Sequence, residues 1–474
     1  MTTLKDEKQA QNQWKLRAGI KLQHLFDTLL ENEFAEVEKL ESHIDSRVGI
    51  VTEYAATYSP YYQAIFKKEG ISSDQLQSFE DLEQLPILTK DDLVDYEEKL
   101  VVPNLPADEK KTLTYTFTSG TSGKRGRILL TRYGANFFTF LMARNYRWFR
   151  MNPMQRFAAL REPRWFTFQN DEAPPMENVR IEKAWHSVGQ IFHTGPALYV
   201  TSTSALEKQQ EMLKQFNPTY LQGYPSVLEE HAFADPDAKI LTSLESLLAI
   251  SAHLTEPMRN RIEAAYKAPV NQNYGVNEIG IIAARCEAGR YHVHTEHCLV
   301  EITDFEGRQC KPGESGRITV TGLNNAAMPL LRYDTGDYAA LPLNKDCDCG
   351  RTLPSFENIY GRYRRWLNVP PGTKHRFTSI TNYFETLPTS LLANVRGYQV
   401  HLKTNGCFIF KIMTKDKIPD EIKRLLHHKW NETYPEETDK FSVLRVSKLE
   451  APMSQKVPDF TSDYDETPRN FELS

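Results

Sequence analysis

A run of hydroxyl, glycine and lysine residues between Tyr115 and Arg125 has side chains and spacing that could do chemistry. The members of the run that could contact phosphate are Thr118, Ser119, Gly120, Thr121, Ser122, Gly123 and Lys124. Hydroxyls and bare backbone N–H groups followed by a fixed positive charge suit a loop that wraps phosphate oxygens. A Walker A loop has four residues between its glycines, whereas two separate Gly120 from Gly123. The run therefore predicts a phosphate loop of another kind, with a polar surface turn as the alternative.

A second segment places an aromatic ring, a glycine and a carboxylate close together in the chain. Its members are Asn273, Tyr274, Gly275 and Glu278. An aromatic side chain can lie against a nucleotide base, and a glutamate can hold Mg²⁺ beside phosphates. The alternative interpretation is a strand end followed by a turn that binds nothing.

Two later positions could complete a nucleotide site. Asp337 follows Gly336 after a strand-like run, and a carboxylate there can accept hydrogen bonds from both hydroxyls of a ribose. The same Gly-Asp pair is also common in turns. Arg362 lies in a basic run at the junction with the C-terminal part of the chain.

The chain that must position these residues has 474 residues, which is long for one compact core and predicts several domains. Its hydrophobic content of 40% and charged content of 25% are typical of globular proteins. The net charge of -5 gives no reason to expect nucleic acid or an anionic membrane as a partner. No apolar run approaches the roughly 18 residues of a membrane span, and the first residues lack the apolar core of a signal peptide. We therefore expect a cytoplasmic enzyme with reduced cysteines.

Hydrophobic periodicity predicts the elements that frame these segments. Apolar residues recur at helical spacing over residues 11–44 and predict one amphipathic helix, and residues 247–251 predict a buried strand. The C-terminal part reads as a compact mixed unit, because Asn405-Gly406 is a strong hairpin signal between two alternating segments. The elements predicted in this unit are strands at 398–403, 407–413 and 441–449 and a helix at 421–433.

The order of these segments resembles the adenylate-forming superfamily of acyl-CoA synthetases and adenylation domains. Within that superfamily the sequence is most similar to the phenylacetate-CoA ligase branch, which includes the CapK-like proteins. Supporting stretches lie at residues 59–62, 85–90, 221–226, 313–316 and 347–351, and the resemblance covers roughly residues 55–460. Each stretch is weak by itself, whereas their joint order and spacing are specific.

The resemblance implies an α/β fold (α+β overall) with two domains. Residues 1–361 would form a large N-terminal adenylation domain with mixed β-sheets and helices. Residues 362–474 would form a small, mobile C-terminal α+β domain. The domain assignment agrees with the change of pattern that precedes the predicted C-terminal hairpin.

The resemblance also implies an ATP-dependent ligase that activates a carboxylic acid. The carboxylate attacks the α-phosphate of ATP and gives an acyl-adenylate and pyrophosphate, and a thiol, most often that of CoA, then displaces AMP. Catalysis of the first step is mainly positioning and electrostatic stabilisation. A carrier-protein thiol, or an amine that gives an amide, is the alternative acceptor, and a non-catalytic AMP- or acyl-binding homologue is the alternative outside enzymes.

Residue roles follow from the resemblance, motif by motif. Glu278 would hold Mg²⁺ with Thr118 close by, Tyr274 would lie against adenine beside Asn273 and Gly275, and Asp337 would hold the ribose. The phosphate-loop residues 118–124 would cradle the β- and γ-phosphates. Arg362 would support the nucleotide near the hinge, and Lys456 would bridge the α-phosphate and the carboxylate.

Two departures from the family pattern concern the second half-reaction. The hinge of this superfamily commonly reads Gly-Arg-x-Asp-Asp, whereas this chain has Arg364 and Arg365 at the acidic positions. No glycine precedes Lys456. The hinge rotation and the acceptor are therefore less firmly implied than the adenylation site. The sequence also leaves open whether the chain acts as a monomer or a homodimer.

Three cysteines and one histidine bracket a strand-rich segment. They are Cys286, His292, Cys347 and Cys349. Three thiolates and one imidazole can close a tetrahedral zinc site, and members of the branch that carry this set resemble zinc binders. Such a closed shell would be structural, because it leaves no open position for a substrate. His294, His297 and Cys298 are competing ligands, and free cysteines are the alternative interpretation.

The segment between the phosphate loop and Tyr274 is rich in aromatic and basic residues. By position in the family it would line the pocket for the acid, which could be aromatic. Arg161, Arg164 and Arg180 hint at a second acidic group on the substrate. Aromatic residues such as Trp185 are also common core fillers, so the sequence does not name the acid.

Overall fold

The computed structural model describes most of the chain in several stretches. These are residues 14–17, 22–117, 126–162, 165, 177–252, 254–304, 306–362, 369–370, 372–385, 387–392, 394–414, 416–449 and 460–464. The predicted phosphate loop at 118–124 and Lys456 lie outside the described residues. The chain divides into two compact units, one of Met1–His253 with Glu263–Gly361 and the other of Leu254–Ile262 with Arg362–Ser474.

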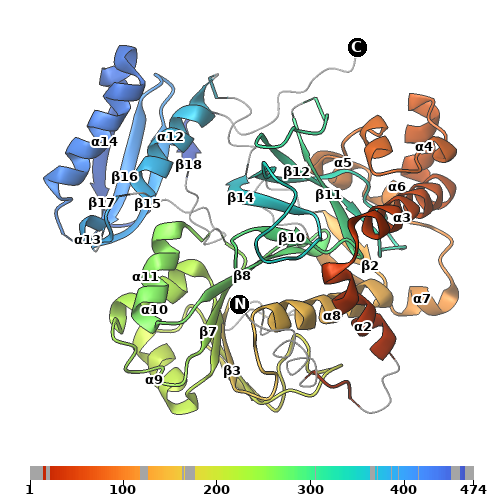
Figure 1. Cartoon of the computed structure of the whole chain (residues 1–474), viewed down its shortest axis with the longest axis horizontal. Helices are drawn as coiled ribbons and strands as arrows, with labels where there is room; N and C mark the ends of the chain where they lie inside the picture. The colour runs from red at the N-terminus through yellow and green to blue at the C-terminus, as the bar shows by residue number, and fades with distance from the viewer. Residues whose placement is uncertain are drawn as a thin grey trace. The chain divides into compact units, whose positions relative to one another are not determined.

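The first unit is built around a mixed sheet that has twelve strands among the described residues (Figure 1). One half of the sheet is parallel. Its strands lie in the order β8, β7, β6, β3 and β5, and each is parallel to the next. Strand β4 forms the edge and is antiparallel to β5. The strands are β3 (Phe157–Arg161), β4 (Val179–Glu182), β5 (Ala197–Thr201), β6 (Tyr220–Gly223), β7 (Ser246–Ala249) and β8 (Val270–Val276). The predicted strand at 247–251 corresponds to β7. Parallel strands require crossover connections, which helices supply here.

The other half of this sheet is mostly antiparallel and follows β8 in the order β9, β10, β14, β13, β12 and β11. These strands are β9 (Gly280–Arg285), β10 (Tyr291–Val293), β11 (Cys298–Thr303), β12 (Ser315–Gly322), β13 (Tyr333–Ala340) and β14 (Ser355–Arg362). A separate hairpin of β1 (Thr114–Phe117) and β2 (Arg127–Leu130) precedes the large sheet in the chain.

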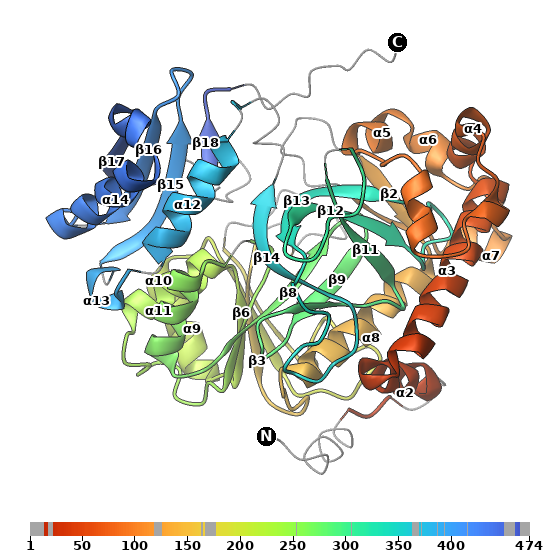
Figure 2. The same cartoon turned by 45° about the horizontal axis from the view of Figure 1, so that its top comes forward.

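Helices cover both faces of the parallel strands (Figures 1 and 2). In both views α8 lies on one side of β3, and α9 and α10 lie on the other. These helices are α8 (Arg132–Trp148), α9 (Leu206–Phe216) and α10 (Pro225–Ala234). Helix α11 (Glu256–Tyr266) begins in the second unit and ends in the first. Thr131 caps α8 by accepting a hydrogen bond from the Gly134 backbone N–H at 3.2 Å, which satisfies an orphan donor of the first turn.

The N-terminal segment forms a helical layer rather than the single helix predicted over 11–44, and that prediction was wrong. Ala35 and Glu36 are extended, and they separate two helices. The break accompanies the burial of Glu33 beside Arg147 and Arg351, a tertiary interaction that periodicity does not report. The elements of this layer are α2 (Gln23–Glu31), η1 (Asn32–Phe34), α3 (Val37–Tyr58), α4 (Pro60–Glu69), η2 (Ser73–Gln75), η3 (Glu80–Gln84), α5 (Lys90–Asp95), α6 (Glu97–Leu100) and α7 (Ala107–Lys111).

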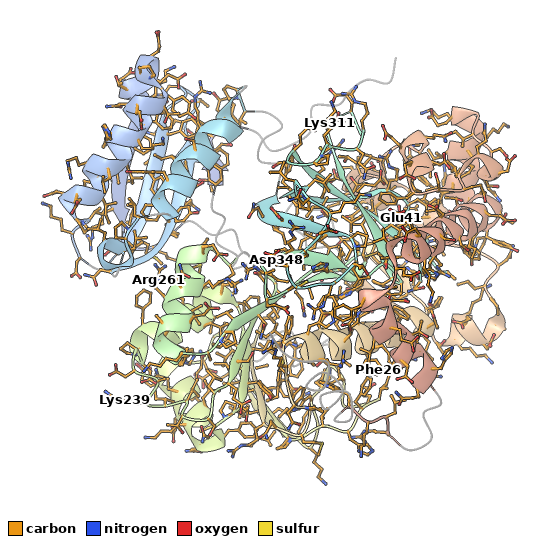
Figure 3. The ribbon with its side chains drawn as sticks, in the orientation of Figure 1. Phe26, Glu41, Lys239, Arg261, Lys311 and Asp348 are labelled. Carbon is orange, nitrogen blue, oxygen red and sulfur yellow. The ribbon has the colours of Figure 1, made fainter. Side chains whose placement is uncertain are left out.

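The main core of the first unit lies between this layer, α8 and the sheet. Phe26 of α2 is 2% exposed and packs on Phe140 and Phe192, whereas Lys239 and Lys311 are exposed (Figure 3). Burying such aromatic rings removes large apolar areas from water and dominates the stability of a core. Trp185 and Phe192, from the aromatic segment assigned to the acid pocket, belong to this core.

The second unit has a four-stranded sheet in the order β17, β16, β15 and β18 among the described residues. Side chains of α12 and α14, such as Phe384 and Trp430, join one hydrophobic core with Val400, Phe408 and Phe410 of the sheet. Alternate strand residues face these two helices, so the helices cover one face. The elements are α12 (Thr373–Glu385), α13 (Thr389–Leu392), β15 (Val395–Leu402), β16 (Phe408–Thr414), α14 (Asp420–Thr433), η6 (Pro435–Lys440), β17 (Phe441–Val446) and β18 (Phe460–Ser462).

The predicted α/β fold class is confirmed by the large mixed sheet with helices and by the separate smaller sheet. The predicted hairpin across Asn405-Gly406 is present as β15 and β16, and the helix predicted at 421–433 is α14. Among the helices that the structure describes, none is both long enough and apolar enough to cross a membrane.

Candidate functional site

The segment with Asn273, Tyr274 and Gly275 ends β8 and enters a hairpin with β9. The register shifts between Tyr274 and Gly275, and a Cβ at Gly275 would collide with the carbonyl oxygen of Gly280. Glycine is therefore required at position 275 by the close approach of the two backbones. The hairpin fixes Tyr274 on the strand and leaves Glu278 in the turn.

Tyr274 and Asp337, the residues predicted to contact adenine and ribose, touch each other. The Tyr274 hydroxyl donates to Asp337 Oδ2 at 3.0 Å and lies 3.2 Å from Thr335 Oγ1. The Tyr274 ring is buried and meets Phe356 edge-on, with 5.7 Å between the ring centroids. Two segments more than sixty residues apart thus present one aromatic–carboxylate pair.

The Gly336-Asp337 pair lies inside a strand, which differs from the strand end expected from the sequence. β13 runs from Tyr333 to Ala340, and its pairing with β12 shifts register around this point. Gly336 has φ +78°, and its N–H donates to Asp334 Oδ1 at 2.8 Å. The positive φ makes a local bulge, so the strand continues while the Asp337 carboxylate is turned toward Tyr274.

Glu278 is buried, and its carboxylate accepts a hydrogen bond from the Tyr333 hydroxyl at 3.1 Å. The neighbouring Asn277 donates its side-chain N–H to the carbonyl oxygen of Phe117 at 3.0 Å. Phe117 is the last residue of β1 and directly precedes Thr118. The contact therefore places Phe117, the residue before the predicted phosphate loop in the sequence, beside the turn that carries Glu278.

The phosphate loop itself falls between two paired strand ends. Phe117 of β1 pairs with Arg127 of β2, so residues 118–126 form the connection of this hairpin. Arg127 is held from outside by Glu97, which accepts from its Nε at 2.9 Å and from its backbone N–H at 2.9 Å. Phe117 and Arg127 are thus held by strand pairing, and Arg127 is held in addition by Glu97 of the N-terminal layer.

A buried arginine fixes the backbone that carries Tyr333. Arg332 has φ +49°, which is unfavourable for a side chain of this size. Its guanidinium donates to both carboxylate oxygens of Glu301, at 2.8 and 3.1 Å, and to the carbonyl oxygens of Leu85 and Gly307, each at 2.6 Å. These bonds compensate a strained conformation next to the site. The similar stretch at residues 85–90 also contacts this strand, because Leu88 N–H donates to the Arg332 carbonyl at 3.0 Å.

The remaining predicted nucleotide residues are placed only in part. Asn273 donates to Met142 Sδ of α8 at 3.8 Å, and its Oδ1 is buried and has no hydrogen-bond partner among the described residues. Arg362 ends β14, and its side chain is outside what the structure describes. Arg332 and Tyr333 lie shortly before Gly336 and Asp337 in the chain, and no short sequence pattern assigns them a role at Glu278.

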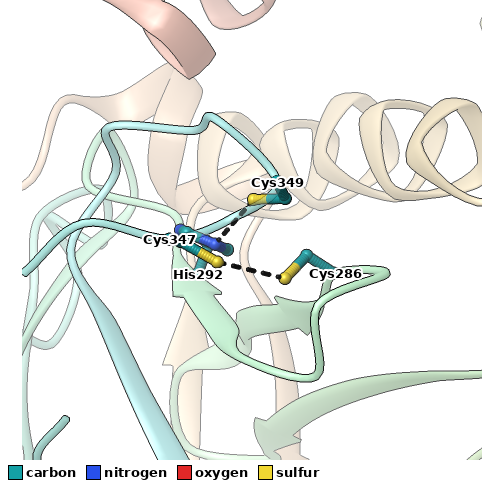
Figure 4. A group of neighbouring side chains, drawn as sticks. All are labelled: Cys286, His292, Cys347 and Cys349. Carbon is teal, nitrogen blue, oxygen red and sulfur yellow. Dashed lines mark hydrogen bonds between the residues drawn. The ribbon is translucent and has the colours of Figure 1, made fainter. Parts of the chain in front are cut away.

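The structure brings the four predicted zinc ligands together (Figure 4). Their ligand atoms all lie within 4.8 Å of one another. Cys286 follows β9, His292 lies on β10, and Cys347 and Cys349 lie on the connection between β13 and β14. The two closest pairs are Cys286 Sγ to Cys347 Sγ at 3.7 Å and Cys349 Sγ to His292 Nε2 at 3.2 Å.

Hydrogen bonding orients the histidine of this Cys/His cluster. His292 Nδ1 lies 2.8 Å from the Leu353 carbonyl oxygen, so Nδ1 carries the proton and Nε2 is the nitrogen that faces the sulfurs. The hydrogen bond from Cys286 lowers the pKa of the Cys349 thiol, and the same bond raises the pKa of Cys286. The cluster therefore favours a thiolate at Cys349.

The competing ligands lie elsewhere. His294 Nδ1 contacts Arg144 at 2.5 Å, His297 Nε2 lies 2.8 Å from the Ile279 carbonyl oxygen, and Cys298 Sγ contacts the Ile282 carbonyl oxygen at 3.8 Å. Burial lowers the pKa of His294 and of His297, so both are neutral core histidines. The structure thus selects Cys286, His292, Cys347 and Cys349 as the set that converges.

An arginine next to the cluster links it to the N-terminal layer. Arg351 donates to Glu287 at 3.0 Å, lies 4.0 Å from the buried Glu33, and stacks 4.5 Å from the centroid of the Trp148 ring. Trp148 also meets His292 edge-on. The sequence did not single out Glu33, because a charged residue in an amphipathic helix pattern normally faces solvent.

Comparison with known sequences identifies a family and several curated relatives. The family model described as "AMP-binding enzyme" matches residues 35–328. The phenylacetate-coenzyme A ligase of Thermus thermophilus is 26% identical over 344 residues, which cover 69% of this chain and 71% of that protein. Protein CapK of Staphylococcus aureus is 22% identical over 316 residues, which cover 66% of each chain.

Solved structures agree at the level of the fold. A 2-hydroxyisobutyryl-CoA ligase in complex with 2-HIB-AMP superposes with a TM-score of 0.67 at 18% identity, covering 92% of this chain and 91% of that chain. An anthranilate CoA ligase in complex with anthranoyl-AMP gives a TM-score of 0.53 at 15% identity, covering 72% of this chain and 64% of that one. At these identities the likeness concerns the fold alone.

Proposed function

The chain belongs to the AMP-binding enzymes, and we propose that it is an ATP-dependent ligase that activates a carboxylic acid as its adenylate and transfers the acyl group to the thiol of CoA. The observation that carries this proposal is the convergence of Tyr274, Asp337 and Glu278 beside the start of the phosphate loop. These residues come from two separate segments, and each has the chemistry that one part of ATP requires.

Each part of the nucleotide has a partner in this arrangement. Asp337 would accept hydrogen bonds from the ribose hydroxyls through the oxygen atom that does not bind Tyr274. Tyr274 would border the adenine, with its ring edge held by Phe356. The hydroxyls and the lysine of residues 118–124 would hold the β- and γ-phosphates, since their hairpin starts beside Glu278.

The first half-reaction is an in-line displacement at phosphorus. An oxygen of the acid forms a bond to the α-phosphorus, the bond to the bridging oxygen breaks, and pyrophosphate leaves with that electron pair. The buried carboxylate of Glu278 is a hard oxygen ligand of the kind that suits Mg²⁺, which would neutralise phosphate charge when bound. Tyr333 orients that carboxylate through its hydrogen bond. Lys456 would contribute positive charge at the α-phosphate.

The second half-reaction moves the acyl group to a thiol. The sulfur attacks the carbonyl carbon of the acyl-adenylate, and AMP leaves with the bonding electron pair while the thiol proton is lost. The similarity to phenylacetate-coenzyme A ligases supports CoA as the acceptor. A carrier-protein thiol or an amine is the alternative, and the basic residues Arg364 and Arg365 at the hinge favour testing both. Arg362 would act at the same hinge.

The Cys/His cluster is proposed as a structural zinc site. Three sulfurs and one nitrogen are the soft and borderline ligands that zinc prefers in a closed tetrahedral shell. The hydrogen bond between His292 Nδ1 and Leu353 supports this assignment, because it is the outer contact expected of a zinc-bound histidine. The ion would tie the β13–β14 connection to β9 and β10.

Acid-dependent exchange of labelled pyrophosphate into ATP tests the proposed adenylation. A panel of aliphatic, aromatic and hydroxylated acids is required, because the acid is not known. Exchange with at least one acid is expected, and Asp337→Ala, which removes the proposed ribose acceptor, should reduce it. If no acid supports exchange while the protein is folded, the enzyme proposal is wrong. Product analysis with CoA, a phosphopantetheine thiol and free amines then identifies the acceptor.

A further inference from the structure

Polar side chains gather on the α8-facing side of the parallel strands, at their carboxyl ends. The register pairs Ala159 with Gln222, Gln222 with Leu248 and Leu248 with Asn271, so these residues share one face of the sheet. Ala159 and Leu248 belong to the core cluster that contains α8, which identifies the face. Arg161 and Asn273 lie on this same face, each two residues further toward the carboxyl end of its strand.

Several of these side chains have buried polar atoms without a hydrogen-bond partner among the described residues. The atoms are Gln222 Oε1, Asn273 Oδ1, Arg161 Nε and, from α8, both Oδ1 and Nδ2 of Asn145. Asn145 is fully buried and Gln222 is 2% exposed, so bulk water does not compensate them. Buried amide groups are almost always hydrogen-bonded, because an unpaired one carries a large desolvation penalty.

Helix α8 runs across this row of strands and brings Asn145 into it. Met142 accepts the hydrogen bond from Asn273, and Tyr146, one turn later, lies close enough to Arg161 to interact electrostatically. Asn145 falls between these two contacts on the sheet-facing side of the helix. Four elements thus direct unsatisfied polar atoms toward one region, and ligands of α/β sheets bind at the carboxyl ends of the strands.

Arg161 gives this region its charge. Its guanidinium is half-buried, lies 5.5 Å from the centroid of the Trp165 ring, and forms no ion pair within the described part of the chain. Burial lowers the pKa of Arg161, while Tyr146, Tyr199, Tyr224 and Glu162 oppose that shift. A desolvated cation of this kind is stabilised by an anion that binds beside it.

The sheet also indicates how far this charge lies from the nucleotide residues. Three strand spacings separate β3 from β8, which is about 14 Å across the sheet. The Arg161 side chain spans part of this distance, and Tyr274 directly follows Asn273 on β8. A ligand that reaches both ends must therefore be several bonds long.

We propose that the acid activated by this protein is a dicarboxylic acid, whose second carboxylate binds Arg161 and accepts hydrogen bonds from the side-chain amide N–H groups of Asn145 and Gln222. The inference rests on the proposed ligase function, since it assigns the substrate of that same site. A purely hydrocarbon acid such as phenylacetate would offer no acceptor to the guanidinium of Arg161 or to these amide N–H groups. Arg161 is then a residue that determines specificity, and the first carboxylate lies at the Asn273 and Tyr274 end, where it meets ATP.

Matched acid pairs test this inference. Hexanoate is compared with adipate and phenylacetate with 4-carboxyphenylacetate, by pyrophosphate exchange and, separately, by calorimetric binding to the full-length protein without ATP. We expect at least one dicarboxylate to bind and to exceed its monoacid tenfold or more in kcat/KM. Arg161→Met should remove this preference. Gln222→Leu should weaken binding of the dicarboxylate severalfold, and an unchanged Tm would show that the variant is still folded.

The control is Arg180→Met, because Arg180 lies on the same Trp165 ring at 5.4 Å but is more exposed and pairs with Glu182 at 3.4 Å. It should keep the preference for the dicarboxylate. Preference for monoacids, or an Arg161→Met variant with unchanged preference, would overturn the inference and leave the ligase proposal intact. Binding of a dicarboxylate that depends on Arg161, without exchange, would support the inference and contradict the ligase. Absence of binding by either dicarboxylate would overturn it.

Discussion

The hydroxyl of Tyr333 donates a 3.1 Å hydrogen bond to the buried carboxylate of Glu278. This hydrogen bond helps to orient the Glu278 carboxylate in the turn between β8 and β9. Arg332, directly before Tyr333 in the chain, has a positive φ and is held by an ion pair with Glu301.

Tyr333→Phe should lower the rate of adenylation and raise the Mg²⁺ concentration needed for half-maximal activity. A hydrogen bond to a charged group is worth about 1.5–3 kcal/mol, so a loss of about tenfold or more is expected. Pyrophosphate exchange measured as a function of Mg²⁺ checks this. Tyr338→Phe is the matched control, because Tyr338 is an equally buried tyrosine of the same strand. A variant with reduced stability but unchanged Mg²⁺ dependence would show that Tyr333 is only structural.

Asp337→Asn should weaken the binding of AMP more than Tyr274→Phe does. The first change removes the charge that would meet the ribose hydroxyls, and we expect about a 10–100-fold higher Kd. The second change removes only the hydroxyl that orients Asp337 and should cost about threefold to tenfold. Calorimetry with AMP on both variants and on the double variant measures their coupling. Strictly additive losses would contradict the view that Tyr274 acts through Asp337.

Purified protein should contain about one zinc ion per chain, bound by the Cys/His cluster. Cys347→Ser should reduce the zinc content and lower the Tm, because the ion connects the β13–β14 connection to β9 and β10. Elemental analysis and thermal unfolding measure both effects. Cys407→Ser in the second unit is the control and should retain the metal. An equal metal content in both variants would assign the cluster to free thiols.

The stability of the protein should fall as the pH drops from about 6.5 toward 4, in part because of His231. Burial lowers the pKa of His231 to about 4, whereas Asp235 opposes the shift, and the ring is hydrogen-bonded to Gln209 at 2.9 Å. The folded state therefore favours the neutral ring. The stability that this neutral ring contributes is fully present above the unfolded pKa and is lost as the pH falls toward the folded pKa. The full difference corresponds to about 3 kcal/mol.

Denaturant unfolding at pH 7.5 and at pH 5 compares the wild type with His231→Gln. The variant should be less stable at pH 7.5 and should lose less stability on acidification, because it no longer takes up this proton on unfolding. His193→Gln serves as the control and should keep the wild-type pH dependence. The same change in unfolding free energy between the two pH values in all three proteins would show that His231 does not contribute to the loss of stability in acid.

The candidate site residues that the sequence singles out lie in short segments. Tyr274, Glu278 and Asp337 could be selected because each belongs to a motif, and the four zinc-ligand candidates because cysteine and histidine are rare. Asn405-Gly406 identified its hairpin because that turn is local.

Relationships between distant segments could not be predicted in the same way. The hydrogen bond from Tyr333 to Glu278 joins residues 55 positions apart, and either residue alone is compatible with many environments. The prediction of one helix over residues 11–44 was wrong because the burial of Glu33 among arginines overrides the amphipathic pattern of that segment. The continuation of β13 through Gly336 was missed because a glycine with positive φ serves a bulge as readily as a turn.

The hydrogen bond from Asn277 to Phe117 makes the two positions unequal in the substitutions they tolerate. At position 117 the acceptor is the backbone carbonyl, so this contact allows any side chain there that suits an exposed strand. At position 277 a side-chain donor of the right length is needed, and among close relatives we expect asparagine to be replaced by residues that can still donate. Position 117, just before the predicted phosphate loop, can therefore vary, whereas the side chain that makes this contact is constrained 160 residues further along the chain.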